Sequence, residues 1–213
     1  MFFILSLLLV TDWPIIIPVV EKSVPRLEMS KNGQSGTCSA VVFLIEDGYA
    51  SALTAAHCVE HGPTERLDIT ANDRNAIVVS FNNILDIAII RFRTSNSITA
   101  IPFASSDPVI GEDVSIIGYA FGVSELVAQF GRVAQPFNRE SKSLWVDAIM
   151  IFGDSGGAVI NLKGELVGIT SRIYSGGSSG QMAHIGAAVP IDAIKDFVEN
   201  YKNELEKAKR KDK

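Results

Sequence analysis

Cysteine and histidine are scarce in this sequence, which contains two cysteines and three histidines in 213 residues. Two cysteines exclude the dense disulfide framework of a small secreted scaffold. Two thiols also fall short of a structural zinc site unless histidines complete it, and only His57 and His61 lie beside Cys58 in the sequence. We therefore expect neither a metal site nor a cofactor.

An excess of positive charge is also missing. The chain carries 19 basic and 24 acidic residues, for a net charge of −5. No overall field therefore favours nucleic acid or an anionic membrane, and we expect no nucleic-acid partner. One basic run closes the chain, more typical of a solvated helix end than of a binding tail: Lys207, Lys209, Arg210, Lys211 and Lys213. The sequence leaves the oligomeric state open.

The N-terminal segment, residues 1–20, lacks two marks of an export signal. No Lys or Arg precedes its apolar run at 2–10, and no A-x-A-like cleavage site follows that run. Asp12, Pro14 and Pro18 come next, and a membrane-spanning helix tolerates them poorly. Two interpretations stay open: a secretion or anchor segment, or an apolar arm packed on the domain. We expect membrane contact only through this segment.

Short runs of Val, Ile, Phe and Leu, bounded by Gly, Asn, Asp and Pro, follow from Ser23 onward and are typical of β-strands. The stretch 93–113 is rich in Ser, Pro and Asp, which indicates a connection between two halves, and 174–181 is predicted to be a loop. We predict strands at 24–29, 39–46, 49–54, 75–81 and 87–93 in the first half, and at 113–119, 126–134, 143–148, 157–161, 165–173 and 184–189 in the second.

One helix is predicted, and it begins after Pro190, since proline is favoured at a helix start. Its apolar residues recur at helical spacing: Ile191, Ile194, Phe197, Val198, Tyr201 and Leu205. The sequence therefore predicts an all-β fold of two packed six-stranded antiparallel barrels with a C-terminal α-helix. We place the domain at 21–213, with barrels at about 21–100 and 108–190 and the helix at about 190–208.

Three short motifs bear chemistry, although each also has an ordinary structural interpretation. "FGDSGGAVI" holds Ser155 among glycines, which suit a tight turn or the close approach of another molecule. "ALTAAHCVE" holds His57, which by itself is consistent with a hydrogen-bonded core histidine. "ILDIAIIRF" places Asp86 before an apolar strand, where an acid must be paired unless it belongs to a turn.

The three residues together supply the parts that acyl transfer needs. Such a reaction requires a nucleophilic hydroxyl, a base that takes its proton and an acid that orients the base. It also requires donors for the oxyanion, and the backbone N–H groups of "GDSGG" can provide them. We predict Ser155, His57 and Asp86 to fill the first three roles.

The blocks "TAAHC", "DIAII" and "GDSGG" resemble, in chain order, the motifs of chymotrypsin-fold serine proteases. The resemblance covers about Ser23 to Tyr201. It is nearer to the HtrA-like bacterial branch than to digestive trypsins, through "IPFASSDPVIGEDVSIIGYAFG", "VDAIMIFGDSGGAVINLKGELVGITSRI" and "IGAAVPIDAIKDFV". It implies His57 as general base, Asp86 as its orienting carboxylate and Ser155 as nucleophile. The implied oxyanion hole is Gly153, Asp154 and Ser155.

The sequence departs from this family pattern in three ways. It has no I-V-G-G-type segment to form a new N-terminus that pairs with Asp154, so we expect no trypsin-style activation. It ends after the helix, so we expect the HtrA-like branch without a PDZ domain. It carries Asp154 where many HtrA-like proteins carry Asn.

The resemblance also implies a disulfide between Cys38 and Cys58, with two buried thiols as the alternative. A disulfide indicates an oxidising compartment, and hence a secreted, periplasmic or membrane-anchored protein. Free thiols would instead indicate a cytoplasmic one.

The same resemblance locates the substrate pocket. Its floor is the residue six before the nucleophile, Ile149, and no carboxylate stands there to attract Lys or Arg. An aliphatic floor favours small or medium aliphatic residues before the scissile bond. The implied walls are Thr170, Ser171, Arg172, Gly186 and Ala187.

The sequence thus predicts a serine endopeptidase that acts on protein or peptide substrates. Two alternatives remain: a narrow-specificity processing protease, and a binding module that keeps the fold without catalysis.

Overall fold

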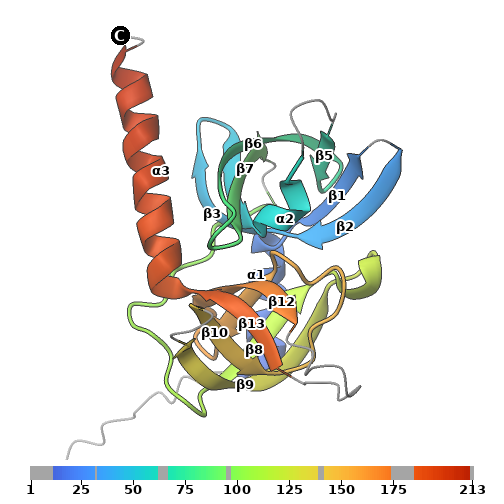
Figure 1. The fold of residues 1–213 in the computed structure, drawn as a ribbon, viewed down its shortest axis with the longest axis vertical. Helices are drawn as coiled ribbons and strands as arrows, with labels where there is room; N and C mark the ends of the chain where they lie inside the picture. Colours follow the sequence, from blue (N-terminus) through green and yellow to red (C-terminus); the bar gives the residue numbers. More distant parts are fainter. Residues whose placement is uncertain are drawn as a thin grey trace, which may run out of the picture.

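Two curled β-sheets, one above the other in Figure 1, make up most of the molecule, and a long C-terminal helix stands beside the upper one. The computed structural model describes residues 12–31, 33–61, 67–94, 97–138, 142–173 and 185–211. The predicted loop at 174–181 lies outside the described residues.

The first sheet has seven antiparallel strands in the order β2-β1-β5-β6-β7-β4-β3. Its two edge strands follow one another in the chain with only Ala40 between them, so the sheet curls back toward itself. Small and aliphatic side chains such as Ala52, Ala88 and Ile90 fill its interior. The strands are β1 (Arg26–Lys31), β2 (Gln34–Ser39), β3 (Val41–Glu46), β4 (Tyr49–Thr54), β5 (Leu67–Ala71), β6 (Arg74–Asn82) and β7 (Ile87–Arg93).

The second sheet is a closed six-stranded barrel in the order β10-β13-β12-β11-β8-β9. This confirms the predicted fold class, with two differences in the first half. The first sheet has seven strands and is curled, where a six-stranded barrel was predicted, because β5 and most of β2 were not predicted. The predicted strand at 39–46 is divided between the end of β2 and β3. The barrel strands are β8 (Asp113–Gly118), β9 (Val127–Asn138), β10 (Ser143–Asp147), β11 (Ala158–Asn161), β12 (Leu166–Ile173) and β13 (Ile185–Pro190), with the short helix η2 (Ala120–Gly122) between β8 and β9.

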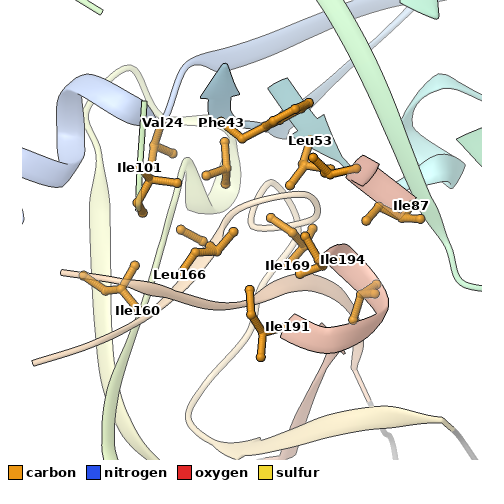
Figure 2. Packing of buried hydrophobic residues seen from close by; sticks show 14 of the residues in the cluster. Val24, Phe43, Leu53, Ile87, Ile101, Ile160, Leu166, Ile169, Ile191 and Ile194 are labelled. Atoms are coloured by element: carbon orange, nitrogen blue, oxygen red, sulfur yellow. The ribbon is translucent and has the colours of Figure 1, made fainter. Parts of the chain in front are cut away.

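A hydrophobic cluster joins the two sheets. The residues of β7 explain why, because Ala88, Ile90 and Phe92 face the first sheet's interior whereas Ile87 and Ile89 face this shared cluster. Burying an aliphatic side chain contributes about 1.5–3 kcal/mol, so the cluster fixes the two halves against one another. Figure 2 shows its members from both sheets, from the C-terminal helix and from connecting segments: Val24, Phe43, Leu53, Ile87, Ile101, Ile160, Leu166, Ile169, Ile191 and Ile194.

The predicted helix is α3 (Ile191–Lys211), and its apolar face packs on this cluster. The Tyr201 hydroxyl lies 3.2 Å from Ser51 Oγ on β4. The basic end of α3 is not wholly solvated, because Lys209 Nζ lies 2.6 Å from Glu46 Oε1 and 3.8 Å from Asp47 Oδ2. The helix therefore contacts the first sheet along much of its length.

The N-terminal segment is described from residue 12 onward. It forms α1 (Trp13–Val20) and η1 (Glu21–Ser23), which pack on the interface cluster through Trp13 and buried Val20. The Trp13 and Phe130 rings lie 5.5 Å apart. Residues 13–20 therefore pack on the domain, whereas the apolar run at 2–10, predicted as a secretion or anchor segment or a packing arm, lies outside the described residues. Among the described helices, none has the length and hydropathy needed to cross a membrane.

Candidate active site

His57 lies in the single-turn helix α2 (Ala56–Val59), directly after β4. Its ring Nδ1 lies 2.9 Å from Oδ2 and 3.0 Å from Oδ1 of Asp86. The His57 backbone N–H donates to Asp86 Oδ1 at 3.0 Å. A carboxylate only accepts hydrogen bonds, so Nδ1 carries the proton and Nε2 is the ring nitrogen left to act as a base.

Asp86 closes the turn before β7 and is 6% exposed. Its φ of 55° lies in the left-handed region, which aspartate tolerates better than most residues. The Ser171 hydroxyl on β12 donates to its Oδ2 at 2.5 Å. Burial raises the pKa of Asp86, but the hydrogen bonds from the His57 ring, Ser171 and the His57 N–H outweigh burial and hold the pKa below its usual value. Asp86 is therefore a charged acceptor at neutral pH.

Ser155 lies in the turn that precedes β11, and the glycines around it are required by close packing. Gly153 has a φ of +100°, and a Cβ there would collide with the Tyr119 carbonyl. Gly156 has a φ of +81°, and a Cβ there would collide with the Ser39 carbonyl and the Thr54 hydroxyl. Gly156 thus lets the serine loop pack closely on the first sheet, and Gly153 lets it pack on the segment after β8.

Ser39, a fully buried residue at the end of β2, holds this loop. Its N–H donates to the Ser155 carbonyl at 2.9 Å, and its hydroxyl donates to the Gly153 carbonyl at 2.8 Å. The Tyr119 N–H donates to the same hydroxyl at 2.9 Å. The sequence does not reveal this role of Ser39, because nothing in the local sequence distinguishes it from a turn serine.

Cys38 and Cys58 form the disulfide that the family resemblance implied, with their Cα atoms 6.4 Å apart. Cys58 follows His57, and Cys38 precedes Ser39. The bridge therefore ties the backbone of the histidine directly to the backbone that holds the serine loop.

Asp154 is fully buried between Gly153 and Ser155. Its Oδ2 accepts the Ile151 N–H and the Gln129 side-chain amide, each at 2.9 Å. Its Oδ1 is buried and has no partner among the described residues. Burial raises the pKa of Asp154 to about 6, and the two hydrogen bonds offset only part of this effect.

The three residues predicted for the oxyanion hole differ in how their N–H groups are used. The Asp154 N–H donates to the Ile151 carbonyl at 3.1 Å. Within the described residues, the N–H groups of Gly153 and Ser155 donate to no acceptor. Two of the three predicted donors thus remain available to a bound group.

A cleft of about 740 Å³ brings His57, Asp86 and Ser155 together. Of the predicted pocket residues, only Ser171 and Arg172 line it. Ile149 lies outside the lining with 55% of its surface exposed. Its neighbour Met150 lines the cleft instead, and the space that a Gly186 side chain would need is taken by the Met150 sulfur. The remaining lining residues are Glu60, Asn83, Ile151 and Phe152.

Thr170 and Ala187, also predicted as pocket walls, are buried in the second barrel. The Thr170 hydroxyl donates to the carbonyls of Asp154 and Gly157, so it supports the serine loop from behind. In the described part of the chain, no group of three or more His, Cys, Asp or Glu side chains is arranged to hold a metal ion.

Comparison with known proteins agrees with this geometry. The trypsin-like peptidase domain family matches residues 38–169, which is more than half of the chain. The chain belongs to this family. The match includes both halves of the cleft described above, from the disulfide through the strand after the serine loop.

Curated relatives of this trypsin-like peptidase domain include HtrA-type proteins, as the resemblance predicted. A probable serine protease do-like of Buchnera aphidicola subsp. Acyrthosiphon pisum is 31% identical over 168 residues. The periplasmic serine endoprotease DegP of Salmonella typhimurium is also 31% identical over 168 residues. Each match covers 75% of this chain but 34% of the relative, so the chain spans about a third of the length of these relatives.

Solved structures show the same fold. The serine endoprotease from Yersinia pestis superposes with a TM-score of 0.72 at 22% sequence identity. The superposition covers 89% of this chain and 66% of that chain.

Proposed function

We propose that this trypsin-like peptidase domain is a serine endopeptidase that forms an acyl-enzyme on Ser155. The observation that carries the proposal is the meeting of the His57–Asp86 pair, from the first sheet, with Ser155, from the second, in one cleft.

The proposed reaction follows from the roles that these groups can fill. The Ser155 hydroxyl attacks the peptide carbonyl while His57 Nε2 takes its proton, and Asp86 stabilises the imidazolium through Nδ1. His57 then gives the proton to the leaving amine, and a water molecule hydrolyses the acyl-enzyme with the same base. The free N–H groups of Gly153 and Ser155 would hold the oxyanion, and one such donor contributes about 10²–10³ in rate.

We propose a preference for small or medium aliphatic residues before the scissile bond. Met150, Ile151 and Phe152 give one end of the cleft an apolar lining, and Met150 limits its depth beside Gly186. Each buried methylene of a substrate contributes about 0.8 kcal/mol there. Arg172, which also lines the cleft, disfavours a basic substrate side chain.

We further propose protein or peptide substrates in a periplasmic or secreted location. The names of the relatives, among them periplasmic serine endoprotease DegP, support this location. The Cys38–Cys58 disulfide supports it independently, because such bonds persist mainly in oxidising compartments.

The proposal is tested by comparing hydrolysis of an unfolded protein such as casein by the native chain and by Ser155→Ala. We expect cleavage after aliphatic residues by the native chain and none by the variant. Ser124→Ala, which removes an exposed hydroxyl elsewhere, is the matched control and should retain full activity. Binding of casein without cleavage by the native chain would instead indicate a binding module, and equal turnover by Ser155→Ala would refute the assigned nucleophile.

A further inference from the structure

A second depression, separate from the catalytic cleft, opens on the first sheet. It has a volume of about 670 Å³ and shares no lining residue with the cleft. Tyr49 on β4, Arg74 and Ile77 on β6, and Arg91 and Arg93 on β7 line it, and we call it the arginine groove. None of these residues takes part in the proposed reaction.

The ladder of the sheet explains why these side chains gather. Tyr49 is paired with Arg93, and Ile77 is paired with Arg91, across adjacent strands. The intervening Phe92 is buried in the interior of the sheet, so Arg91 and Arg93 project from its outer face. Both guanidinium groups lie over the Tyr49 ring, at 4.5 Å and 5.4 Å from its centroid.

The arginine groove has no ion pair in the part of the chain that the structure describes. Among the described residues, no carboxylate lies within ion-pair distance of Arg74, Arg91 or Arg93. Glu46 and Asp47, in the turn before Tyr49, are already paired with Lys209 from α3, and the carboxylate of Asp73, next to Arg74 in the chain, is exposed. Neighbouring like charges repel one another, so three unpaired guanidinium groups in one groove indicate a site for an external anion.

We propose that the arginine groove binds an acidic segment of another polypeptide. Guanidinium forks match the geometry of carboxylates, and the exposed apolar surface of Ile77 and the Tyr49 ring suit the side chains between the acids. The groove is concave, whereas a membrane surface is broad and flat. The chain's net charge of −5 provides no extended positive field for a nucleic acid. Binding of a short acidic peptide requires positive charge only within the groove itself.

The test uses the full chain carrying Ser155→Ala, so that the probe is not cleaved. The probe is a fluorescein-labelled peptide of alternating glutamate and leucine, measured by fluorescence anisotropy. We expect saturable binding that weakens as salt is added. Each lost guanidinium should cost about tenfold in affinity, as measured with Arg93→Gln and with Arg91→Gln plus Arg93→Gln.

Two matched controls sharpen the result. Arg132→Gln removes an exposed arginine of the second barrel, which pairs with Asp113, and should leave the affinity unchanged. A peptide with lysine in place of glutamate should not bind. Arg93→Gln alone, at the end of β7, decides the matter if the double variant does not fold, as judged by circular dichroism.

Several outcomes would overturn the proposal. These are equal affinity of the native and arginine variants for the acidic peptide, equal binding of the lysine peptide, and absence of any binding. Arginine-dependent binding to phosphatidylserine vesicles or to duplex DNA, without binding to the peptide, would also overturn it in favour of a different anion.

Discussion

Asp86 and Asp154 are both buried beside Ser155, yet their carboxylates are held in opposite ways. Asp86 accepts hydrogen bonds from the His57 ring, the His57 N–H and the Ser171 hydroxyl, and these bonds lower its pKa. Asp154 has two neutral donors on one oxygen, no partner on the other, and a pKa of about 6. The surroundings of Asp86 thus stabilise its ionised carboxylate, whereas the surroundings of Asp154 destabilise its ionised carboxylate.

The two acids consequently have opposite effects on stability as the pH changes. The Asp86 pKa is below its unfolded value of 3.8, so its contribution is present above that pH and is lost as the pH falls through the lower folded pKa. The Asp154 pKa is raised from 3.8 to about 6, so ionised Asp154 destabilises the fold above pH 6. That cost disappears as the pH falls from about 6 toward 4.

The largest expected effect comes from Asp86→Asn, which removes the charge but keeps the shape. An amide in place of the carboxylate favours the wrong His57 tautomer and leaves the imidazolium without its counter-charge. We expect turnover of a peptide substrate to fall by a factor on the order of 10⁴ at pH 8. A fall of less than tenfold would show that Asp86 is not the orienting acid.

The covalent tie between the two halves gives the next largest effect. The disulfide closes a loop with a sequence separation of 20, so replacing both cysteines by serine should lower the free energy of unfolding by about 3 kcal/mol. Urea denaturation measures this change, and we expect activity to fall with it, because the bridge joins the neighbours of His57 and Ser39. Full activity in a destabilised variant would mean that the bridge does not position the site.

Asp154→Asn should act in the opposite direction. A neutral amide removes the buried, half-partnered charge, so we expect the free energy of unfolding at pH 8 to rise by about 2–3 kcal/mol. The gain should shrink as the pH falls to 5, as measured by urea denaturation at both pH values. Asp113→Asn, at an exposed carboxylate paired with Arg132, is the matched control. Lower stability of Asp154→Asn at pH 8 would show that the ionised carboxylate is needed in the fold.

Ser171→Ala should produce the smallest change, because Asp86 keeps its bonds to His57. Loss of one hydrogen bond to a charged group should lower turnover about tenfold. The Asp86 pKa should rise at the same time, because the carboxylate loses one of the hydrogen bonds that lower it. Thr170→Ser, which changes the preceding residue of β12 but keeps its hydroxyl, is the control, and its turnover should stay near that of the native chain. Unchanged turnover in Ser171→Ala would remove Ser171 from the description of the site.

The sequence predicted the groups that local motifs mark and missed those that long-range packing supplies. His57, Asp86 and Ser155 each lie in a distinctive stretch, and the two sets of apolar runs predicted two β-structures. The strand β5 was missed because it has only five residues, although they alternate between apolar and polar, and β2 was missed because its residues are mostly small and polar. Ser39 and Ser171 were missed as supports because their partners lie far away in the chain.

The substrate pocket shows the same limit more sharply. Counting six residues back from Ser155 leads to Ile149, but the structure turns Met150 into the cleft and leaves Ile149 mostly exposed. Residues 149–152 lie outside any strand, so the backbone path through this loop decides which of their side chains face the cleft. The preference for aliphatic residues therefore stays a proposal that now depends on Met150.

The central claim, that Ser155 is a nucleophile activated by His57, is tested most directly by labelling with a fluorophosphonate. The reagent bonds to an activated serine oxygen with loss of fluoride, and mass spectrometry of the digested protein locates the adduct. We expect one adduct on Ser155 in the native chain, and labelling greatly slowed in His57→Ala. No adduct on the folded native chain, or an adduct on another residue while Ser155 stays unmodified, would contradict the account.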